Sequence, residues 1–344
     1  MDATLNRENV MFTKLKLNTQ LYLAFGAMVL LLGVVSVVAL IALNSGYENF
    51  VDYRANARDS NISGRIQSNV LSLRLSALKY LKDQNQASIN EFTNRYQLLN
   101  DLIQSGKRQF NDANKVKAIT TIEQEALTYK SAFEKIVNLI NKRNEVVSNM
   151  LDANGKYMRE GISEVIQLSM QNNDVSALFY SSQLQESLLL GRLYAAKFLV
   201  NNTQEELNRA KQEFTVLLDR LESLAKTVSG NKEQTLLADV KLRTNEYIEG
   251  LVLVNEAISE RNTVISGTLD KIGPAIAEQI EQIKLASQNR QDEIGPMLQV
   301  SSKNAINTIL VFSLIIIAVG IFLSIFISRL IKAPIGGEPS EIAR

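Results

Sequence analysis

Residues 21–43 read LYLAFGAMVLLLGVVSVVALIAL, a run of about 23 residues without a charge. A second run, residues 309–328, reads ILVFSLIIIAVGIFLSIFIS and has about 20 uncharged residues. As helices, runs of this length cross a hydrocarbon core of roughly 30 Å. The first run is longer than the apolar region of a signal peptide, and no A-x-A-like cleavage site follows it. The sequence therefore predicts two transmembrane helices, at residues 21–43 and 309–328.

The charges that flank these runs predict their orientation. Lys14 and Lys16 precede the first run, while Arg329 and Lys332 follow the second. Positive charge concentrates on the cytoplasmic side of membrane helices. We therefore expect residues 1–20 and 329–344 in the cytoplasm and residues 44–308 in the periplasm of a bacterial cell, with both helices in the inner membrane. A segment as long as residues 44–308 needs its own core.

The residue types that are missing restrict the chemistry of the chain. It contains no histidine and no cysteine, which removes imidazole bases, thiol nucleophiles and the usual nitrogen and sulfur ligands of zinc. We therefore expect no enzymatic activity, no metal and no cofactor. The formal net charge of +1 gives no electrostatic reason to expect a nucleic-acid partner.

The periplasmic segment has the pattern of an all-α domain. Apolar residues recur at helical spacing, as at Ile62, Ile66, Val70, Leu73, Ala77 and Leu81, and no proline precedes Pro274. Thr203 and Glu206 have the spacing of a capping box at a helix start. Clusters of Asn, Asp, Ser and Gly predict turns between six helices at residues 83–86, 105–106, 172–174, 201–203 and 229–231.

The last helix sets the expected architecture. From about Asn231 into the second membrane run it would have about 75 residues, or roughly 110 Å at 1.5 Å per residue. One ordinary four-helix bundle is too short to bury such a helix, so we expect an elongated domain of two stacked four-helix bundles. Gly273-Pro274 and Gly295-Pro296 are expected to interrupt the helix.

The chain repeats itself at an offset of about 118 residues. Residues 74–81 return at 192–199, with Arg74 matched by Arg192, and Tyr129 returns as Tyr247. The motif Arg-Asn-x-Val at residues 143–146 returns at 261–264, and Leu-Asp-x-x-Gly at 151–155 returns at 269–273. Polar residues and glycines kept at one offset indicate an internal duplication.

Four arginines are the candidate ligand-binding residues, namely Arg74, Arg143, Arg192 and Arg261. On a helix, the neighbours of a residue lie three and four positions away, and for these arginines all such neighbours are apolar. A guanidinium on an apolar face needs an anion or several acceptors, and its planar fork matches a carboxylate. Two structural alternatives remain, a partner such as Glu145 or Glu260, or a contact across a dimer interface.

The two spans, the helical segment and the duplication together resemble the helical bimodular sensor family of chemoreceptors and some sensor kinases. The resemblance implies two stacked four-helix bundles, a homodimer in the lipid bilayer, and recognition of small organic anions such as carboxylates. Residues 329–339 read RLIKAPIGGEP, which looks like the junction into the HAMP relay domain of methyl-accepting chemotaxis proteins. On this reading the chain stops at the start of that relay, and the output module is missing.

The resemblance also bears on the arginines. Arg74, Arg192 and Arg261 match positions where dicarboxylate-binding members of the family carry arginines, and Arg143 is a weaker candidate for a second site. Those members have another arginine where this chain has Ala77. We therefore expect a monocarboxylate, or an acid whose other groups are uncharged. Helix lengths put Arg143 and Arg192 at different heights, so whether there are one or two sites stays open.

The sequence thus predicts a transmembrane chemoreceptor that senses a small organic acid. Two alternatives remain. One is the sensor half of a nucleotide cyclase or of a histidine kinase, whose phospho-acceptor histidine this chain does not contain. The other is a structural membrane protein whose helical domain binds a partner protein and no small molecule.

Overall fold

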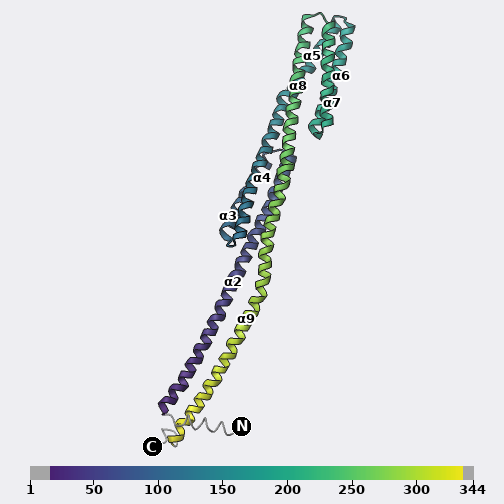
Figure 1. The fold of residues 1–344 in the computed structure, drawn as a ribbon. Helices are drawn as coiled ribbons and strands as arrows, with labels where there is room; N and C mark the ends of the chain where they lie inside the picture. The colour runs from purple at the N-terminus through teal and green to yellow at the C-terminus, as the bar shows by residue number, and fades with distance from the viewer. Residues whose placement is uncertain (1–15, 336–344) are drawn as a thin grey trace. The chain divides into compact units, whose positions relative to one another are not determined.

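The computed structural model describes residues 16–335, and these residues are helical apart from short turns, with no strand among them (Figure 1). The helices are α2 (Leu17–Asp83), α3 (Gln86–Gln109), α4 (Ala113–Val146), α5 (Ala153–Gln171), α6 (Val175–Asn201), α7 (Gln204–Thr227), α8 (Asn231–Val264) and α9 (Asp270–Ile335). A π-helical segment, Val147–Asp152, joins α4 to α5, and another, Ile265–Leu269, joins α8 to α9. Counted with these segments, the described residues form six continuous helices, which confirms the all-α prediction. Lys14 and residues 336–344 of the expected relay junction lie outside the described residues.

Short polar side chains begin most of the helices, as the turn predictions require. The Asn85 side chain accepts a hydrogen bond from the backbone N–H of Ser88 at 2.9 Å, and Asp174 accepts one from Ala177 at 2.9 Å. At Thr203 the first half of the capping box is present, because the backbone N–H of Glu206 donates to the Thr203 hydroxyl oxygen at 3.4 Å. The Thr203 hydroxyl in turn donates to the Glu206 carboxylate at 2.9 Å. The turns at 83–86, 172–174, 201–203 and 229–231 are confirmed.

Two other predictions about breaks are wrong. No turn forms at residues 105–106, because Gly106 is buried inside α3, against Ile66 and Ile119. The Gly-Pro pairs at 273–274 and 295–296 do not interrupt the last helix, since both lie inside α9. The change in helix type falls earlier, at Ile265–Leu269. The matching segment Val147–Asp152 has no proline after it in α5, so proline is not what produces a π-helical turn here.

The helix lengths confirm the duplication. Helices α3 and α7 both have 24 residues, and α4 and α8 both have 34 residues. Each second copy starts 118 residues after the first, at 204 against 86 and at 231 against 113. The π-helical segments follow α4 and α8 at the same offset. The two copies therefore share their secondary structure as well as their scattered matching residues.

Residues 65–281 form one of two units into which contacts divide the chain. Within it, α5, α6, α7 and α8 pack into a four-helix bundle, here called the second bundle. Its core contains fully buried side chains from every helix, among them Ile162, Leu188, Phe214 and Leu251. Figure 1 shows these four helices side by side. Burial of this apolar surface is the main source of their stability.

The same unit contains another set of four packed helices, here called the first bundle. It consists of α3, α4, the end of α2 and the start of α9. The Phe133 ring on α4 stacks on Phe92 of α3, with centroids 3.6 Å apart, and meets Tyr80 of α2 edge-on at 5.2 Å. Gln279 of α9 donates a hydrogen bond to Glu125 of α4 at 2.9 Å. Each bundle thus contains helices from both copies of the repeat.

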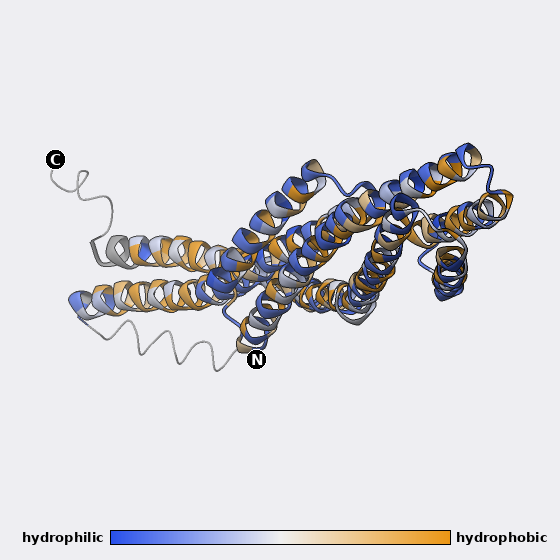
Figure 2. Cartoon of the chain, turned by 90° about the horizontal axis from the view of Figure 1, so that it is seen from above, coloured by the Kyte–Doolittle hydropathy of each residue, from blue (hydrophilic) through white to orange (hydrophobic). Residues whose placement is uncertain are grey.

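The other unit contains the rest of α2 and α9, up to residue 64 and from residue 282. Both helices carry an apolar window long enough to cross a membrane, and 0% and 6% of the residues in these windows are buried. Orange and pale residues predominate there in Figure 2, in the two helices that join the grey terminal traces. A core helix of a soluble protein would be mostly buried, so these exposed apolar helices fit membrane spans.

Candidate functional site

The second bundle holds a cluster around Arg192, which lies on α6. The arginine packs against the backbone of Gly155 on α5, because a methyl group at Gly155 would lie only 2.9 Å from Nε of Arg192. The same methyl group would lie 3.4 Å from the ring of Tyr247 on α8. Asp152 is one helical turn before Gly155 and acts electrostatically on Tyr247. We call Arg192, Tyr247, Asp152 and Gly155 the Arg192 cluster.

The first bundle holds the equivalent cluster around Arg74, which lies on α2. A methyl group at Gly273 of α9 would lie 2.9 Å from Cδ and Nε of Arg74. Tyr129 of α4 feels the charges of Arg74 and Asp270. The four members of this Arg74 cluster, namely Arg74, Tyr129, Asp270 and Gly273, correspond one for one to those of the Arg192 cluster at the 118-residue offset.

Each cluster forms because its bundle contains helices from both copies of the repeat. The arginine and the tyrosine of each cluster come from one copy, and the aspartate and the glycine come from the other copy. The two copies therefore form two equivalent clusters, and neither copy can form one alone.

Both tyrosines are almost completely buried, with 4% of each residue exposed. Burial raises the pKa of Tyr129 to about 12, with Arg74 lowering and Asp270 raising it. Burial likewise raises the pKa of Tyr247 to about 12, with Arg192 lowering and Asp152 raising it. Both phenols therefore stay protonated at physiological pH and can act as hydrogen-bond donors.

The arginines of the two clusters have no partner within the described protein. Among residues 16–335, no hydrogen bond or ion pair joins the side chain of Arg74 or Arg192 to another group. The alternative partner Glu260 forms an ion pair with Lys135 instead, at 2.7 Å. Each cluster thus presents an unpaired guanidinium and a buried phenol, which are both donors, and the oxygens of a carboxylate could accept from them.

Arg143 and Arg261 lie apart from the two clusters. Arg143 donates to the side-chain oxygen of Asn144 at 2.8 Å and to the backbone oxygen of Leu199 at 3.0 Å. Arg261 donates to Asn262, at 3.1 Å from Nε and 2.8 Å from Nη2. The four predicted arginines are therefore at three places, and Arg261 does not share a cluster with Arg74 or Arg192.

The apolar surroundings of the cluster arginines are only partly buried. Val70 and Leu188 are buried, but Leu71 and Leu78 beside Arg74 are 50% and 58% exposed. Leu189 beside Arg192 is 54% exposed. The sequence pattern correctly identified an apolar helix face around each arginine. Half of the residues on that face are nevertheless exposed, and the arginines themselves are half-buried.

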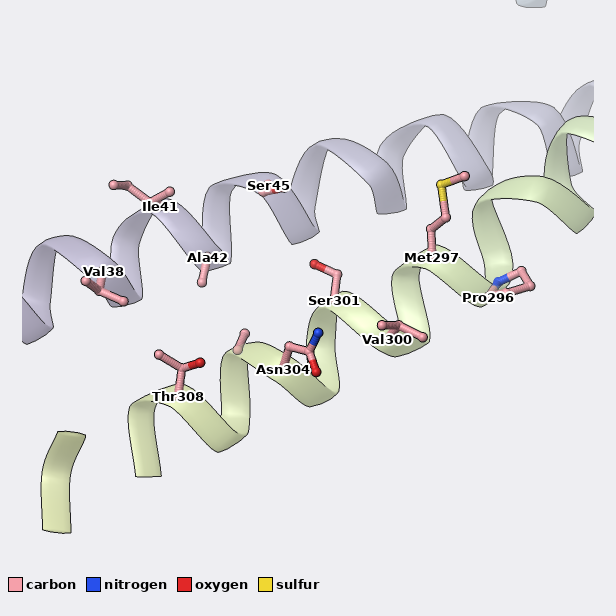
Figure 3. A pocket seen from close by; sticks show the side chains of 11 residues that line it. Val38, Ile41, Ala42, Ser45, Pro296, Met297, Val300, Ser301, Asn304 and Thr308 are labelled. Carbon is pink, nitrogen blue, oxygen red and sulfur yellow. The ribbon is translucent and has the colours of Figure 1, made fainter. Parts of the chain in front are cut away.

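The unit of membrane-type helices contains a cavity of about 850 Å³ between α2 and α9. Figure 3 shows Val38, Ile41, Ala42 and Ser45 of α2 on one side and α9 residues such as Met297 and Val300 on the other. The lining contains no charged residue, so it offers a carboxylate no ionic partner. The candidate anion sites are therefore the arginine clusters.

Sequence reasoning missed the tyrosine, aspartate and glycine of each cluster as site residues. All six had been noted as matches between the repeat copies. The sequence feature that could have identified them is their recurrence, together with the arginine, at the same offset. Leucines can match at such an offset by composition alone, whereas Tyr, Asp and Gly rarely do so. What the sequence could not give was the pairing of each arginine with the glycine of the other copy.

Residues 14–187 match the family model described as a four helix bundle sensory module for signal transduction. No curated protein matches the chain. The match covers the first membrane-type helix, the first copy of the repeat and the start of α6, including Arg74 and Arg143.

Proposed function

The chain belongs to the family of four-helix-bundle sensory modules for signal transduction, and on that basis we propose that it is the sensory part of a chemoreceptor that binds a small organic acid. The observation that supports such a ligand is the pair of equivalent clusters, each with an arginine that has no partner among residues 16–335. A half-buried guanidinium without a hydrogen-bonding partner is costly, and a bound carboxylate would remove that cost. A histidine kinase or cyclase sensor would use the same module, so the kind of output is a separate question.

The clusters favour a ligand with one carboxylate. Each has one arginine and one tyrosine as donors, and Ala77 stands where a second arginine would clamp another carboxylate. Asp152 and Asp270 add a negative charge to their clusters and would repel a second carboxylate. An acid whose other groups are uncharged or positively charged meets both conditions.

The bound ligand would act on the membrane-type helices by displacing helix α9. The Arg74 cluster includes Asp270 and Gly273 at the start of α9, the helix that also contains the second membrane-type run. A ligand that favours one packing of the bundle would shift α9 by on the order of 1–2 Å. We propose that this shift reaches a HAMP relay beginning at residues 329–344, and that the two bundles stack along the membrane normal. Small-angle scattering that gave a compact particle would contradict the stacking.

A homodimer is the proposed assembly. Exposed leucines form a stripe beside the arginine on each repeat copy, Leu71 and Leu75 on α2 and Leu189 and Leu193 on α6. Exposed apolar stripes of this kind are typical of interaction surfaces, and a second copy would cover the same stripe on both chains.

A single cysteine at this stripe tests the orientation and the dimer together, because the natural chain has no cysteine. In intact cells, Leu193→Cys is expected to react with a maleimide that cannot cross the cytoplasmic membrane, and a bis-maleimide is expected to link two chains. The exposed Gln124→Cys is the control, which should be labelled without being linked. Absence of labelling would contradict the periplasmic location, and labelling without linkage at position 193 would contradict the dimer.

The sensory role is tested by restoring an output. Residues 1–344 fused to the cytoplasmic part of a chemoreceptor, in cells that lack their own receptors, are expected to change swimming behaviour when a small carboxylate is added. The response should disappear in the Arg74→Ala, Arg192→Ala double variant while the protein remains in the membrane. A chain that is only a structural membrane protein would give no response to any acid in either form.

A further inference from the structure

Arg143 of α4 and Arg261 of α8 lie close enough for their charges to interact, where α4 packs against α8. Helices α4 and α8–α9 are antiparallel neighbours, and the hydrogen bond between Glu125 and Gln279 fixes their register. Moving along α4 from Glu125 to Arg143, and back along α9 and α8 from Gln279 to Arg261, covers the same number of residues. The two arginines are also equivalent positions of the repeat, so they lie where the two copies meet symmetrically.

Among the residues that the structure describes, these two positive charges have no negatively charged partner. The hydrogen-bond acceptors of Arg143 and Arg261 are two asparagine amides and one backbone carbonyl, all neutral. Among residues 16–335 no ion pair includes either arginine. Of the carboxylates on these helices, Glu260 pairs with Lys135, and Glu145 is exposed, two positions from Arg143, on another face of the helix.

Both guanidinium groups are also partly removed from water. Burial lowers the pKa of Arg143, and burial together with the charge of Arg143 lowers the pKa of Arg261. Two like charges in a half-buried place raise the free energy of the folded chain unless an anion lies between them. Arginine stays protonated in proteins, so losing a proton does not relieve the repulsion.

We propose that Arg143 and Arg261 together bind one small dianion, such as a tetrahedral oxyanion, at the crossing of α4 and α8. A dianion would neutralise both charges, and a tetrahedral arrangement of oxygens can accept from guanidinium groups on opposite sides. The position is distinct from both arginine clusters, so this site would be occupied independently of the organic acid. A π-helical segment begins a few residues after each arginine, and such segments are frequent at functional sites. An anion here would hold the two repeat copies together.

Inorganic sulfate is the probe for this site. The full chain in nanodiscs of neutral lipid is titrated with sulfate, with chloride of equal ionic strength as the reference, and its melting temperature is followed. We expect sulfate to raise the melting temperature, and the apparent affinity to fall at least tenfold in Arg143→Gln and in Arg261→Gln. Arg65→Gln, which changes an exposed arginine on α2, should leave the sulfate response unchanged.

Reversing the charge of Arg261 shows whether a lost sulfate response reflects loss of the binding site or unfolding of the protein. In Arg261→Glu the new carboxylate would face Arg143 and take the place of the anion. This variant is expected to melt at a higher temperature than Arg261→Gln without sulfate and to ignore sulfate. The Arg74→Ala, Arg192→Ala double variant should keep the wild-type sulfate response even though it no longer binds carboxylates. An unchanged response in Arg143→Gln and Arg261→Gln, or a response lost only in the cluster variant, would overturn the proposal.

Discussion

Replacing Arg192 by Ala is expected to weaken carboxylate binding at the Arg192 cluster roughly ten- to hundredfold. The substitution removes a hydrogen-bonding charge, and such bonds contribute about 1.5–3 kcal/mol, which corresponds to that factor in affinity. Because Arg74 belongs to another bundle, its cluster should keep its affinity. Calorimetric titration of the full chain in nanodiscs should therefore show one of two binding steps lost, and Arg74→Ala should remove the other.

Gly155→Ala provides the matched test that keeps the charge. The new methyl group would lie 2.9 Å from Nε of Arg192, so the flexible end of the arginine must move away from its position. Carboxylate affinity at this cluster should fall although the net charge is unchanged. Gly267→Ala is the control, because no atom lies within 4 Å of a methyl group placed there. Wild-type binding in both Arg192→Ala and Gly155→Ala would show that the site is elsewhere.

Phe133→Ala is expected to lower the free energy of unfolding by about 3–5 kcal/mol, the usual cost of removing a large aromatic side chain from a core. Phe133 is 2% exposed, stacks on the Phe92 ring of α3 and meets the Tyr80 ring of α2 edge-on. The loss should appear as a lower denaturation midpoint for the first bundle. The control Phe179→Ala removes a ring that is 58% exposed and should change stability by less than about 0.5 kcal/mol. Equal effects of the two substitutions would contradict the assignment of the first core.

The positions of helix ends were predictable because they depend on local chemistry. Asn85, Asp174 and Thr203 cap helices with their own side chains, and residues of these types are preferred at helix starts and in turns. The break at Gly106 was predicted wrongly because its cause is not local. Gly106 is buried in α3 beside Ile66 of α2 and Ile119 of α4, and a single sequence cannot distinguish a glycine buried inside a helix from a glycine used in a turn.

The π-helical segments had no comparable signal. A π-helical turn changes which backbone groups pair, and no side-chain type in residues 147–152 or 265–269 requires it. The repeat did mark these places, since Asn144 and Asp152 recur as Asn262 and Asp270. In the structure Asp152 and Arg192 both act electrostatically on Tyr247, which the repeat alone does not indicate.

The candidate site was predictable in part for a similar reason. Counting neighbours along a helix selects residues on an apolar face, and it selected all four arginines that the structure half-buries. It says nothing about which helix lies opposite. The family resemblance groups Arg261 with Arg74 and Arg192, whereas in the structure the charge of Arg261 interacts with that of Arg143.

Titration of the unchanged full chain with a series of small monocarboxylates measures directly whether the arginine clusters bind an acid. We expect at least one acid to bind with a stoichiometry of two per chain, one for each arginine cluster, and the Arg74→Ala, Arg192→Ala double variant to give no binding heat. An acid that binds the double variant as tightly as the unchanged chain, or a complete series without binding heat, would contradict this expectation.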